Sequence, residues 1–292
     1  MNIAILGKGK YGEAIGSLLE YNHVAFTYIT KTNKYNRNLD ILFLATPTQS
    51  LREALTMNRE NIDENTIIIN CSKGIEEGTC QFPHQIVQGF FPRSRYLSII
   101  GPSFANGLTE QNPTIVSLGY SSNDALSTIQ KIITTPYLKL VPTKDIATLE
   151  LAGALKNVYA ILCGYATGLG FGPNTLIRLM LGIFQEIEQC AEEMDFPLAN
   201  TTTPGIIGDI ILTCSSRQSR NFTYGYNIAL KNDTSPHETN NNTVEGYHTC
   251  YSIEELLSNR MDQCPLIQIT TQLVRGGSLS KDQFTSKIAT IC

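Results

Sequence analysis

The chain has 292 residues, 42% hydrophobic residues, 16% charged residues and a formal net charge of -4. This length favours two domains of ordinary size over one core. The composition is globular, and it excludes both a disordered chain and a protein built of apolar membrane segments. The negative charge argues against a nucleic acid partner, because binding to phosphate backbones needs a clustered positive field.

Sequence features at the N-terminus and at the cysteines indicate a cytoplasmic protein. No basic region followed by a long apolar stretch opens the chain, so we expect no secretory signal. The eight cysteines form no C-x-x-C pair and have no histidine cluster beside them. This pattern favours reduced thiols and no metal site.

One uncharged stretch, residues 157–177, is long enough to cross a bilayer. Its second half contains several glycines and Pro173, which would end a helix near residue 170. We therefore expect a buried helix followed by a loop, and no membrane span.

The first half of the chain alternates short β-rich runs with helical stretches, such as 12–19 and 50–55. This alternation is typical of a parallel sheet covered by helices. The expected strands are residues 3–6, 25–29, 41–46, 66–70, 96–100, 114–118 and 138–141.

The pattern becomes helical after residue 145. Long helices are expected at 145–168 and 175–193, with shorter ones at 223–230 and 253–258. The predicted fold class is α/β, with an N-terminal Rossmann-like parallel sheet domain (1–144) and a mostly helical C-terminal domain (145–292). The boundary is placed where a predicted strand ends in a proline and a charged pair. The polar residues 232–243 are expected to form an exposed loop.

Three glycines, Gly7, Gly9 and Gly12, lie in a G-x-G-x-x-G pattern between the first predicted strand and the first helix. Glycines at such a turn allow a tight bend, close approach of a pyrophosphate and packing of the helix on the strand. The alternative is a glycine-rich turn that binds nothing. Its place at the start of an alternating chain favours dinucleotide binding.

Polar residues follow two later strands at their carboxyl ends, where doubly wound sheets bind ligands. Lys73 follows one strand, and Gly101 and Ser103 follow another. We expect Lys73 to face a substrate and Ser103 to line the same crevice. The alternative for Lys73 is a solvated lysine in a loop.

Lys156 lies within a long predicted helix whose other faces are mostly apolar. Lysine is rarely buried without a partner, and desolvation lowers the pKa of a lysine. A buried Lys156 would therefore lose and regain a proton near neutrality, as acid–base catalysis requires. The alternative is a lysine that extends to the helix surface.

Asp209 lies inside an apolar segment, where a carboxylate needs a cation such as Lys156. Arg220 and Asn221 offer a fork of donors that suits a phosphate group. The alternatives are a helix cap for Asp209 and a surface position for Arg220.

In their order and in nearly all of their residues, these four segments resemble the NAD(P)-dependent sn-glycerol-3-phosphate dehydrogenase family. The resemblance spans almost the whole chain, and residues 149–157, 208–214 and 219–221 carry it more specifically than the glycine turn. It implies an enzyme, often dimeric and cytoplasmic, that interconverts dihydroxyacetone phosphate and glycerol 3-phosphate by hydride transfer. Such an enzyme supplies glycerol 3-phosphate for phospholipid synthesis.

The resemblance also implies residue roles. Lys156 would be the catalytic proton donor and acceptor at the C2 oxygen, Lys73 would polarise that oxygen, and Asp209 would position Lys156. The implied substrate contacts include these three and Gly101, Ser103, Asn157, Thr213, Ser219, Arg220 and Asn221, the last two at the phosphate. The predicted NAD or NADP contacts are Gly7, Gly9, Lys10, Tyr11, Gly12, Thr30, Lys31, Lys73, Ala105, Arg220, Thr243 and Glu245.

One segment departs from the family pattern. Where the family inserts a further strand and helix, this chain has only residues 30–38. Residues 27–34 contain no acidic residue of the kind that binds the ribose of NAD, and offer Thr30, Lys31 and Lys34 instead. We therefore expect NADPH to be used at least as well as NADH. In the alternative, the lysines are solvated and the short loop weakens the binding of both cofactors.

Two other functions remain open from the residues alone. One is a reductase of another hydroxyacid or ketoacid, and the other is a cofactor-binding sensor without catalysis. The first would not be expected to carry Arg220 and Asn221 in their present context. The second would not need Lys156 together with Asp209.

Overall fold

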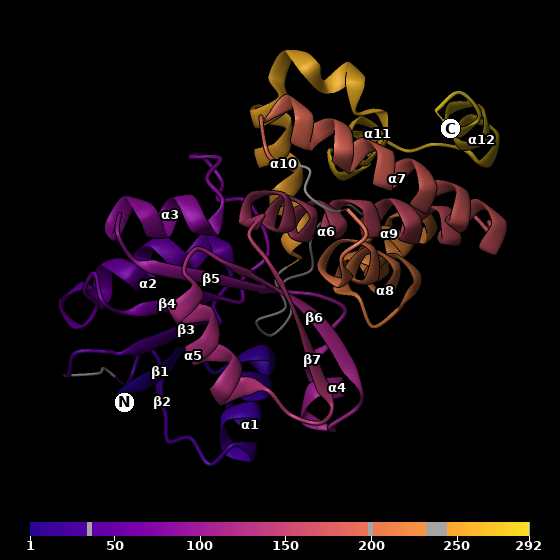
Figure 1. Ribbon diagram of the computed structural model, residues 1–292. Helices are drawn as coiled ribbons and strands as arrows, with labels where there is room; N and C mark the ends of the chain where they lie inside the picture. Colours follow the sequence, from indigo (N-terminus) through magenta and orange to yellow (C-terminus); the bar gives the residue numbers. More distant parts are fainter. Residues whose placement is uncertain (34–36, 198–200, 232–243, 292) are drawn as a thin grey trace. The chain divides into compact units, whose positions relative to one another are not determined.

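A computed structural model describes residues 1–33, 37–197, 201–231 and 244–291 (Figure 1). The described chain divides into two compact units. Unit 1 comprises residues 1–73, 81–150 and 203–206, and unit 2 comprises 74–80, 151–202 and 207–292. Lys34, Thr243 and the predicted loop 232–243 lie outside the described residues.

Unit 1 contains a seven-stranded sheet in the order β2-β1-β3-β4-β5-β6-β7. All neighbouring strands are parallel except β5 and β6. The predicted Rossmann-like α/β class is confirmed, with one correction, since β6 is antiparallel to β5. The strands are β1 (Ile3–Leu6), β2 (Thr27–Ile29), β3 (Ile41–Leu44), β4 (Ile67–Asn70), β5 (Arg95–Ile100), β6 (Thr114–Tyr120) and β7 (Leu138–Thr143).

The connection after β5 explains the reversal of β6. Its only α-helix is α4 (Ala105–Thr109), which has five residues. Such a helix spans about 7.5 Å, whereas a six-residue strand spans about 20 Å. Because α4 cannot carry the chain back along the sheet, β6 starts near the end of β5 and runs in the opposite direction.

Helices cover both faces of this sheet. One hydrophobic cluster joins alternate strand residues such as Ile5 and Phe43 to α1 (Lys10–Tyr21), α4 and α5 (Asn123–Ile133). A second cluster joins the opposite strand face to α2 (Leu51–Met57) and α3 (Pro83–Phe90). Burial on both faces is the reason that the central strands are apolar without interruption.

Unit 2 is helical, as predicted for the second half of the chain. Its first helix, α6 (Ile146–Gly168), begins in unit 1 and continues into unit 2. The others are α7 (Pro173–Glu193), α8 (Asp209–Ser215), α9 (Arg220–Lys231), α10 (Glu245–Leu257), α11 (Pro265–Val274) and α12 (Lys281–Ala289). Short helical turns occur in unit 1 at Thr48–Ser50 and Arg59–Asn61, in unit 2 at Ser258–Gln263, and across the division between the units at Pro204–Gly208.

The uncharged stretch noted in the sequence, residues 157–177, forms the second half of α6, the turn after it and the first residues of α7. By length and composition α6 could cross a membrane, and 89% of its most apolar window is buried inside the protein. The predicted end of the helix near residue 170 is confirmed, and Gly164 lies within α6 at a close contact with α9. A Cβ atom at Gly164 would lie 1.9 Å from the Phe222 carbonyl oxygen, and one at Gly225 would lie 1.9 Å from that of Ile161.

Two short segments pack in the other unit than their neighbours in the chain, which no pattern in the sequence predicted. Residues 203–206 pack in unit 1, where the Gly205 N–H donates to Ser117 Oγ over 2.9 Å. Residues 74–80 pack in unit 2, where Ser252 Oγ donates to the Ile75 carbonyl over 3.4 Å. The predicted boundary at 144/145 therefore differs from the division by contacts, which falls inside α6.

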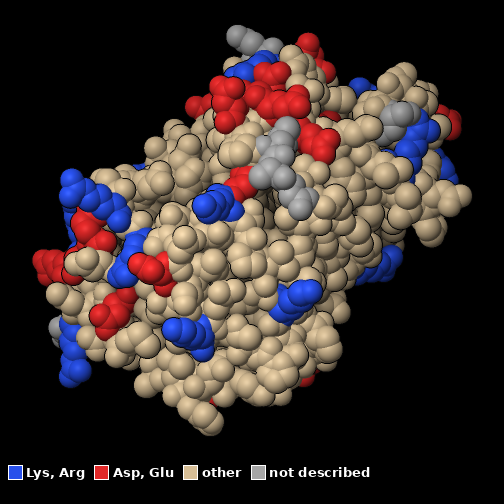
Figure 2. Space-filling model, viewed as in Figure 1, with Lys and Arg blue, Asp and Glu red and all other residues tan. Residues whose placement is uncertain are grey.

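Charged side chains are spread unevenly over the surface. On the face shown in Figure 2, Lys and Arg side chains lie mostly singly among uncharged residues, whereas acidic side chains gather at the top of the view, over part of unit 2. The chain has 26 acidic and 22 basic residues, so this gathering reflects position more than composition.

A buried carboxylate in unit 2 replaces a local cap at the start of α11. Glu186 on α7 is 5% exposed and accepts hydrogen bonds from the backbone N–H groups of Leu266 and Ile267, each over 2.7 Å. Tyr159 Oη also donates to it. Burial raises the pKa of Glu186 to about 7, and the hydrogen bonds oppose this rise only in part.

The raised pKa predicts a pH dependence of stability. Between its ordinary pKa of 4.5 and the folded-state pKa of about 7, folded Glu186 keeps a proton that the unfolded chain has lost. The free energy of unfolding should therefore fall by about 3 kcal/mol as pH rises through this window. Urea unfolding across the window measures the slope. Glu186→Gln should remove it, and Glu192→Gln, an exposed change on the same helix, should keep it. An unchanged slope in Glu186→Gln would contradict the assignment.

Candidate functional site

Two of the three positions in the glycine turn of unit 1 leave no room for a side chain. Gly7 has a φ of +106°, and a Cβ atom there would lie 2.5 Å from the Ala45 carbonyl oxygen. A Cβ atom at Gly12 would lie 2.2 Å from the Gly7 carbonyl oxygen. These two glycines therefore permit the bend itself and the packing of α1 against β1.

Gly9 has a different reason to be glycine. Apart from Gly9 and its two neighbours in the chain, no atom of the described residues lies within 4 Å of the position its Cβ would take, and Gly9 is the exposed N-cap of α1. Helix N-termini carry unpaired backbone N–H groups and a partial positive charge. The open space and the N–H donors together fit the pyrophosphate of a dinucleotide. The turn also lies at the switch point of the sheet, since β1 is flanked by β2 and β3.

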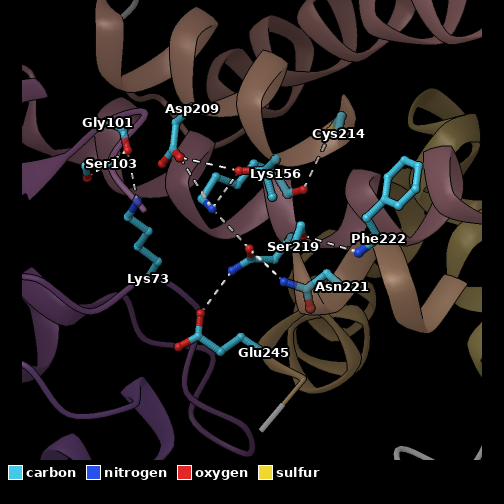
Figure 3. Close-up of polar contacts among 12 residues, drawn as sticks. Lys73, Gly101, Ser103, Lys156, Asp209, Cys214, Ser219, Asn221, Phe222 and Glu245 are labelled. Carbon is cyan, nitrogen blue, oxygen red and sulfur yellow. Dashed lines mark hydrogen bonds and ion pairs between the residues drawn. The ribbon is translucent and has the colours of Figure 1, made fainter. Parts of the chain in front are cut away.

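Four predicted residues of unit 1 come together beside this turn. Tyr11 Oη lies 3.1 Å from Ser103 Oγ, and the Ser103 hydroxyl donates to the Gly101 carbonyl over 3.2 Å. Lys73 Nζ donates to the same carbonyl over 3.3 Å (Figure 3). A Cβ atom at Gly101 would lie 2.7 Å from Val116 Cα, so this strand end admits only glycine.

The shortened segment after β2 begins with a compact turn. The Thr30 N–H donates to the Asn33 carbonyl, and the Asn33 N–H donates to Thr30 Oγ1, each over 3.1 Å. Lys31 is exposed on this turn, and Lys10 is exposed on the first turn of α1. Ala105 is the first residue of α4 and is half-buried.

Lys156 lies at the centre of a buried polar network in unit 2 (Figure 3). It is 6% exposed, which excludes the alternative of a surface lysine. Its Nζ lies 3.5 Å from Asp209 Oδ1 and donates to Thr213 Oγ1 over 3.1 Å. Thr213 donates in turn to Asp209 over 3.4 Å. Asp209 and Thr213 lie one turn apart on α8, so a single short helix supplies both partners.

A second branch of the network runs through two asparagines. Asn157 Oδ1 accepts from Lys156 Nζ over 3.2 Å and from Asn221 Nδ2 over 2.9 Å. Asn157 Nδ2 donates to Glu245 Oε2 over 3.2 Å, at the first residue of α10. Asn221 Oδ1 accepts from the Gly246 N–H over 2.9 Å. The two amides therefore connect α6, α9 and the start of α10.

Two predicted substrate residues open α9 with different surroundings. Ser219 is buried, and its Oγ accepts from the Phe222 N–H over 3.3 Å, which is the geometry of a helix cap. Arg220 is exposed, as its alternative interpretation expected. Its position in the first helical turn leaves the guanidinium accessible to a ligand from solvent.

The arrangement can hold and exchange a proton. A buried ammonium is costly unless it is paired, and Asp209 supplies the opposite charge. Thr213 and Asn157 accept two further hydrogen bonds from Lys156. These three partners fix the direction of Nζ, which is the requirement for acid–base chemistry at one substrate atom.

Two buried polar residues of unit 1 were not predicted as site residues. Asn70 is fully buried at the end of β4, and Glu150 is 2% exposed in α6. The sequence does contain a signal for Glu150, since a carboxylate within an apolar helix needs a buried partner, as Lys156 does. Asn70 gave no signal, because a terminal strand asparagine is common at turns.

Comparison with known proteins gives matches in both halves of the chain. The family model of the NAD-dependent glycerol-3-phosphate dehydrogenase N-terminus matches residues 23–126, and that of the C-terminus matches residues 145–284. A glycerol-3-phosphate dehydrogenase [NAD(P)+] of Afipia carboxidovorans is 34% identical over 243 residues, covering 81% of this chain and 71% of the relative. One of Neorickettsia sennetsu is 28% identical over 325 residues, covering 99% and 94%.

The fold agrees with the sequence matches. The crystal structure of glycerol-3-phosphate dehydrogenase from Coxiella burnetii has a TM-score of 0.86 and 21% sequence identity, covering 99% of this chain and 97% of that one. The two family models together cover most of the chain. This chain therefore belongs to the NAD-dependent glycerol-3-phosphate dehydrogenase family.

Proposed function

We propose that the protein interconverts dihydroxyacetone phosphate and sn-glycerol 3-phosphate with NAD(P)H, with most cofactor contacts in unit 1 and most substrate contacts in unit 2. The observation that carries the proposal is the buried network of Lys156, Asp209 and Thr213, in a chain that belongs to this family. The test is the absorbance of NADPH and NADH during turnover of dihydroxyacetone phosphate. Unphosphorylated dihydroxyacetone and small ketoacids serve as control substrates.

Lys156 is the proposed proton donor and acceptor at the C2 oxygen. The bound nicotinamide would supply or accept the hydride at C2. As C2 is reduced its oxygen gains negative charge, and a proton from Lys156 Nζ neutralises it; the reverse reaction returns that proton. Asp209, 3.5 Å from Nζ, stabilises the ammonium form and holds its direction. Lys73 is proposed to polarise the same oxygen.

The substrate contacts are proposed mainly on polar groups of the Lys156 network and at the start of α9. Asn157, Thr213 and Asn221 would hold the hydroxyl groups, and Arg220 with Asn221 would bind the phosphate. Ser219 would contribute through its cap of α9. Gly101 and Ser103 are further proposed substrate contacts.

The cofactor contacts are proposed around the glycine turn. Gly7, Gly9 and Gly12 would accommodate the pyrophosphate, with Lys10, Tyr11 and Ala105 beside it. Thr30 and Lys31 would meet the 2′-phosphate of NADP, whereas Lys73, Arg220 and Glu245 would contact the nicotinamide half. Thr243, which lies outside the described residues, belongs to the same proposal.

The two competing functions are disfavoured by specific observations. A sensor without catalysis has no use for a buried lysine that is held by a carboxylate and a threonine. A reductase of unphosphorylated hydroxyacids has no use for Arg220 beside Asn221.

We also propose that the enzyme works in the cytoplasm and supplies phospholipid precursors. We propose in addition that it forms a homodimer, for which the exposed side chains of Ile177 and Leu181 on α7 offer an apolar face.

The first functional prediction concerns Lys156. Lys156→Met should lower kcat by about 10²- to 10⁴-fold, because it removes the group that transfers the proton. Binding of NADPH, followed by fluorescence titration, should stay nearly unchanged. Thermal denaturation checks that the variant is folded. Turnover near that of wild type in a folded variant would remove Lys156 from the mechanism.

The second functional prediction concerns the phosphate. Arg220→Lys should raise the KM for dihydroxyacetone phosphate about tenfold, since an ammonium cannot reproduce a planar two-pronged contact. Arg217→Lys is the matched control, because Arg217 is exposed nearby and stacks on Tyr226 at 4.4 Å. If steady-state kinetics show no change in Arg220→Lys, the phosphate binds elsewhere.

The third functional prediction concerns cofactor choice. Wild type should use NADPH at least as well as NADH, measured as kcat/KM at saturating dihydroxyacetone phosphate. Lys31→Glu should shift the ratio toward NADH about tenfold, because it places a negative charge beside the 2′-phosphate. Lys131→Glu, an exposed change on α5, should leave the ratio unchanged. A wild-type preference for NADH of about tenfold, or 1.4 kcal/mol, would overturn the expectation.

A further inference from the structure

The side chain of Asn70 makes more hydrogen bonds than a turn residue needs. It is fully buried at the last position of β4, three residues before Lys73. A side-chain amide offers one oxygen that accepts and two N–H groups that donate. In Asn70 both ends of the amide are engaged with the chain that leads to Lys73.

Asn70 holds the peptide groups on both sides of Ser72. Asn70 Oδ1 accepts from the Ser72 N–H over 2.9 Å, and Asn70 Nδ2 donates to the Ser72 carbonyl over 2.9 Å. Ser72 is itself 5% exposed, and its hydroxyl donates to the Thr46 carbonyl at the end of β3. The residue directly before Lys73 is therefore fixed at its N–H, its carbonyl and its side chain.

Asn70 is held in turn by a buried carboxylate. Its Nδ2 lies within 3.3 Å of Glu150 Oε1 and of Ser98 Oγ. Glu150 also accepts hydrogen bonds from Tyr96 Oη and from the His84 backbone N–H. These contacts come from β5, α3 and α6, so the orientation of the Asn70 amide is set by three elements of unit 1.

Only the amide of asparagine satisfies both requirements at this position. The oxygen must accept from Ser72, and the nitrogen must donate to Ser72 and toward Glu150. An aspartate would lose both donors and would face the carboxylate of Glu150. The reach of Lys73 to the Gly101 carbonyl therefore begins from a backbone that Asn70 holds in place.

We propose that Asn70 is a positioning residue for Lys73, and that Glu150 fixes Asn70 for this task. The proposal rests on the proposed contact of Lys73 with the substrate. Asn70 touches neither substrate nor cofactor in this role. It acts by aiming the Lys73 side chain from a backbone that cannot rotate at Ser72.

The test is a double-mutant cycle on kcat/KM for dihydroxyacetone phosphate. Asn70→Ala should lower kcat/KM roughly 10- to 100-fold in the wild-type background, because a displaced contact of about 1 Å costs that much. In the Lys73→Ala background it should lower kcat/KM no further. Its loss of melting temperature should be the same in both backgrounds. A purely structural role would reduce kcat/KM equally in both.

Two further variants keep the test decisive. Asn70→Ser retains a weaker form of the same turn, and should recover part of the activity lost in Asn70→Ala. It also serves if Asn70→Ala does not fold. Tyr96→Phe removes one bond to Glu150 without touching Ser72, and should lower the melting temperature while kcat/KM stays close to that of wild type.

The outcomes separate the two proposals. If Lys73→Ala lowers kcat/KM but Asn70→Ala and Asn70→Ser do not, the positioning role of Asn70 is overturned and the role of Lys73 stands. If Asn70→Ala lowers kcat/KM equally in both backgrounds, its role is structural only. If Lys73→Ala itself has no effect, the proposed function of Lys73 fails, and the positioning role fails with it.

Discussion

The burial of the Lys156 ammonium is the constraint on which unit 2 depends. An unpaired charge in that position would be strongly unfavourable, and removing one partner of a buried ion pair costs about 3–5 kcal/mol. Asp209 on α8 pairs with the charge, and Thr213 on α8 and Asn157 accept hydrogen bonds from the ammonium group. Because Lys156 lies on α6 while Asp209 and Thr213 lie on α8, these two helices must stay at a fixed distance. Stability and the proposed chemistry therefore place the same demand on the packing.

Glycines make that packing close enough. A Cβ atom at Gly246 would lie 2.4 Å from the Asn157 carbonyl oxygen, so α10 can approach α6 only without a side chain there. The approach brings the Gly246 N–H within 2.9 Å of Asn221 Oδ1. Gly164 and Gly225 do the same where α6 meets α9. The polar network therefore depends on the glycine contacts, since longer distances between helices would break the amide hydrogen bonds.

Much of this could be predicted from the sequence, for physical reasons that also mark the limit. Apolar runs such as Ile41–Leu44 identify strands because they are buried on both faces, and Lys156 was found because a charge among apolar residues needs a partner. Periodicity does not show the direction in which a strand runs, so the reversal of β6 was not predicted. Periodicity also does not show which helices contact each other, so the close contact of Gly164 with α9 was not predicted. Asn70 was missed because its role depends on Glu150, which lies 80 residues away in the chain.

The shortened segment after β2 separates cofactor choice from the proton chemistry. Within the described part of the chain the sheet ends at β2, which has three residues and pairs only with β1. Beyond it lies the turn closed by Thr30 and Asn33, so the adenosine end of a cofactor bound at the glycine turn would meet an exposed turn instead of a further strand. The bend at Gly7 lies against the Ala45 carbonyl, after β3, and the Gly7 N–H donates to the Ile29 carbonyl over 3.0 Å, at the end of β2 and before the shortened segment. The closest steric contacts of Gly7 and Gly12 and the hydrogen bonds of Lys156 given above involve other residues than 30–33. Changes within residues 30–33 can therefore alter affinity for the adenosine half while these contacts are kept.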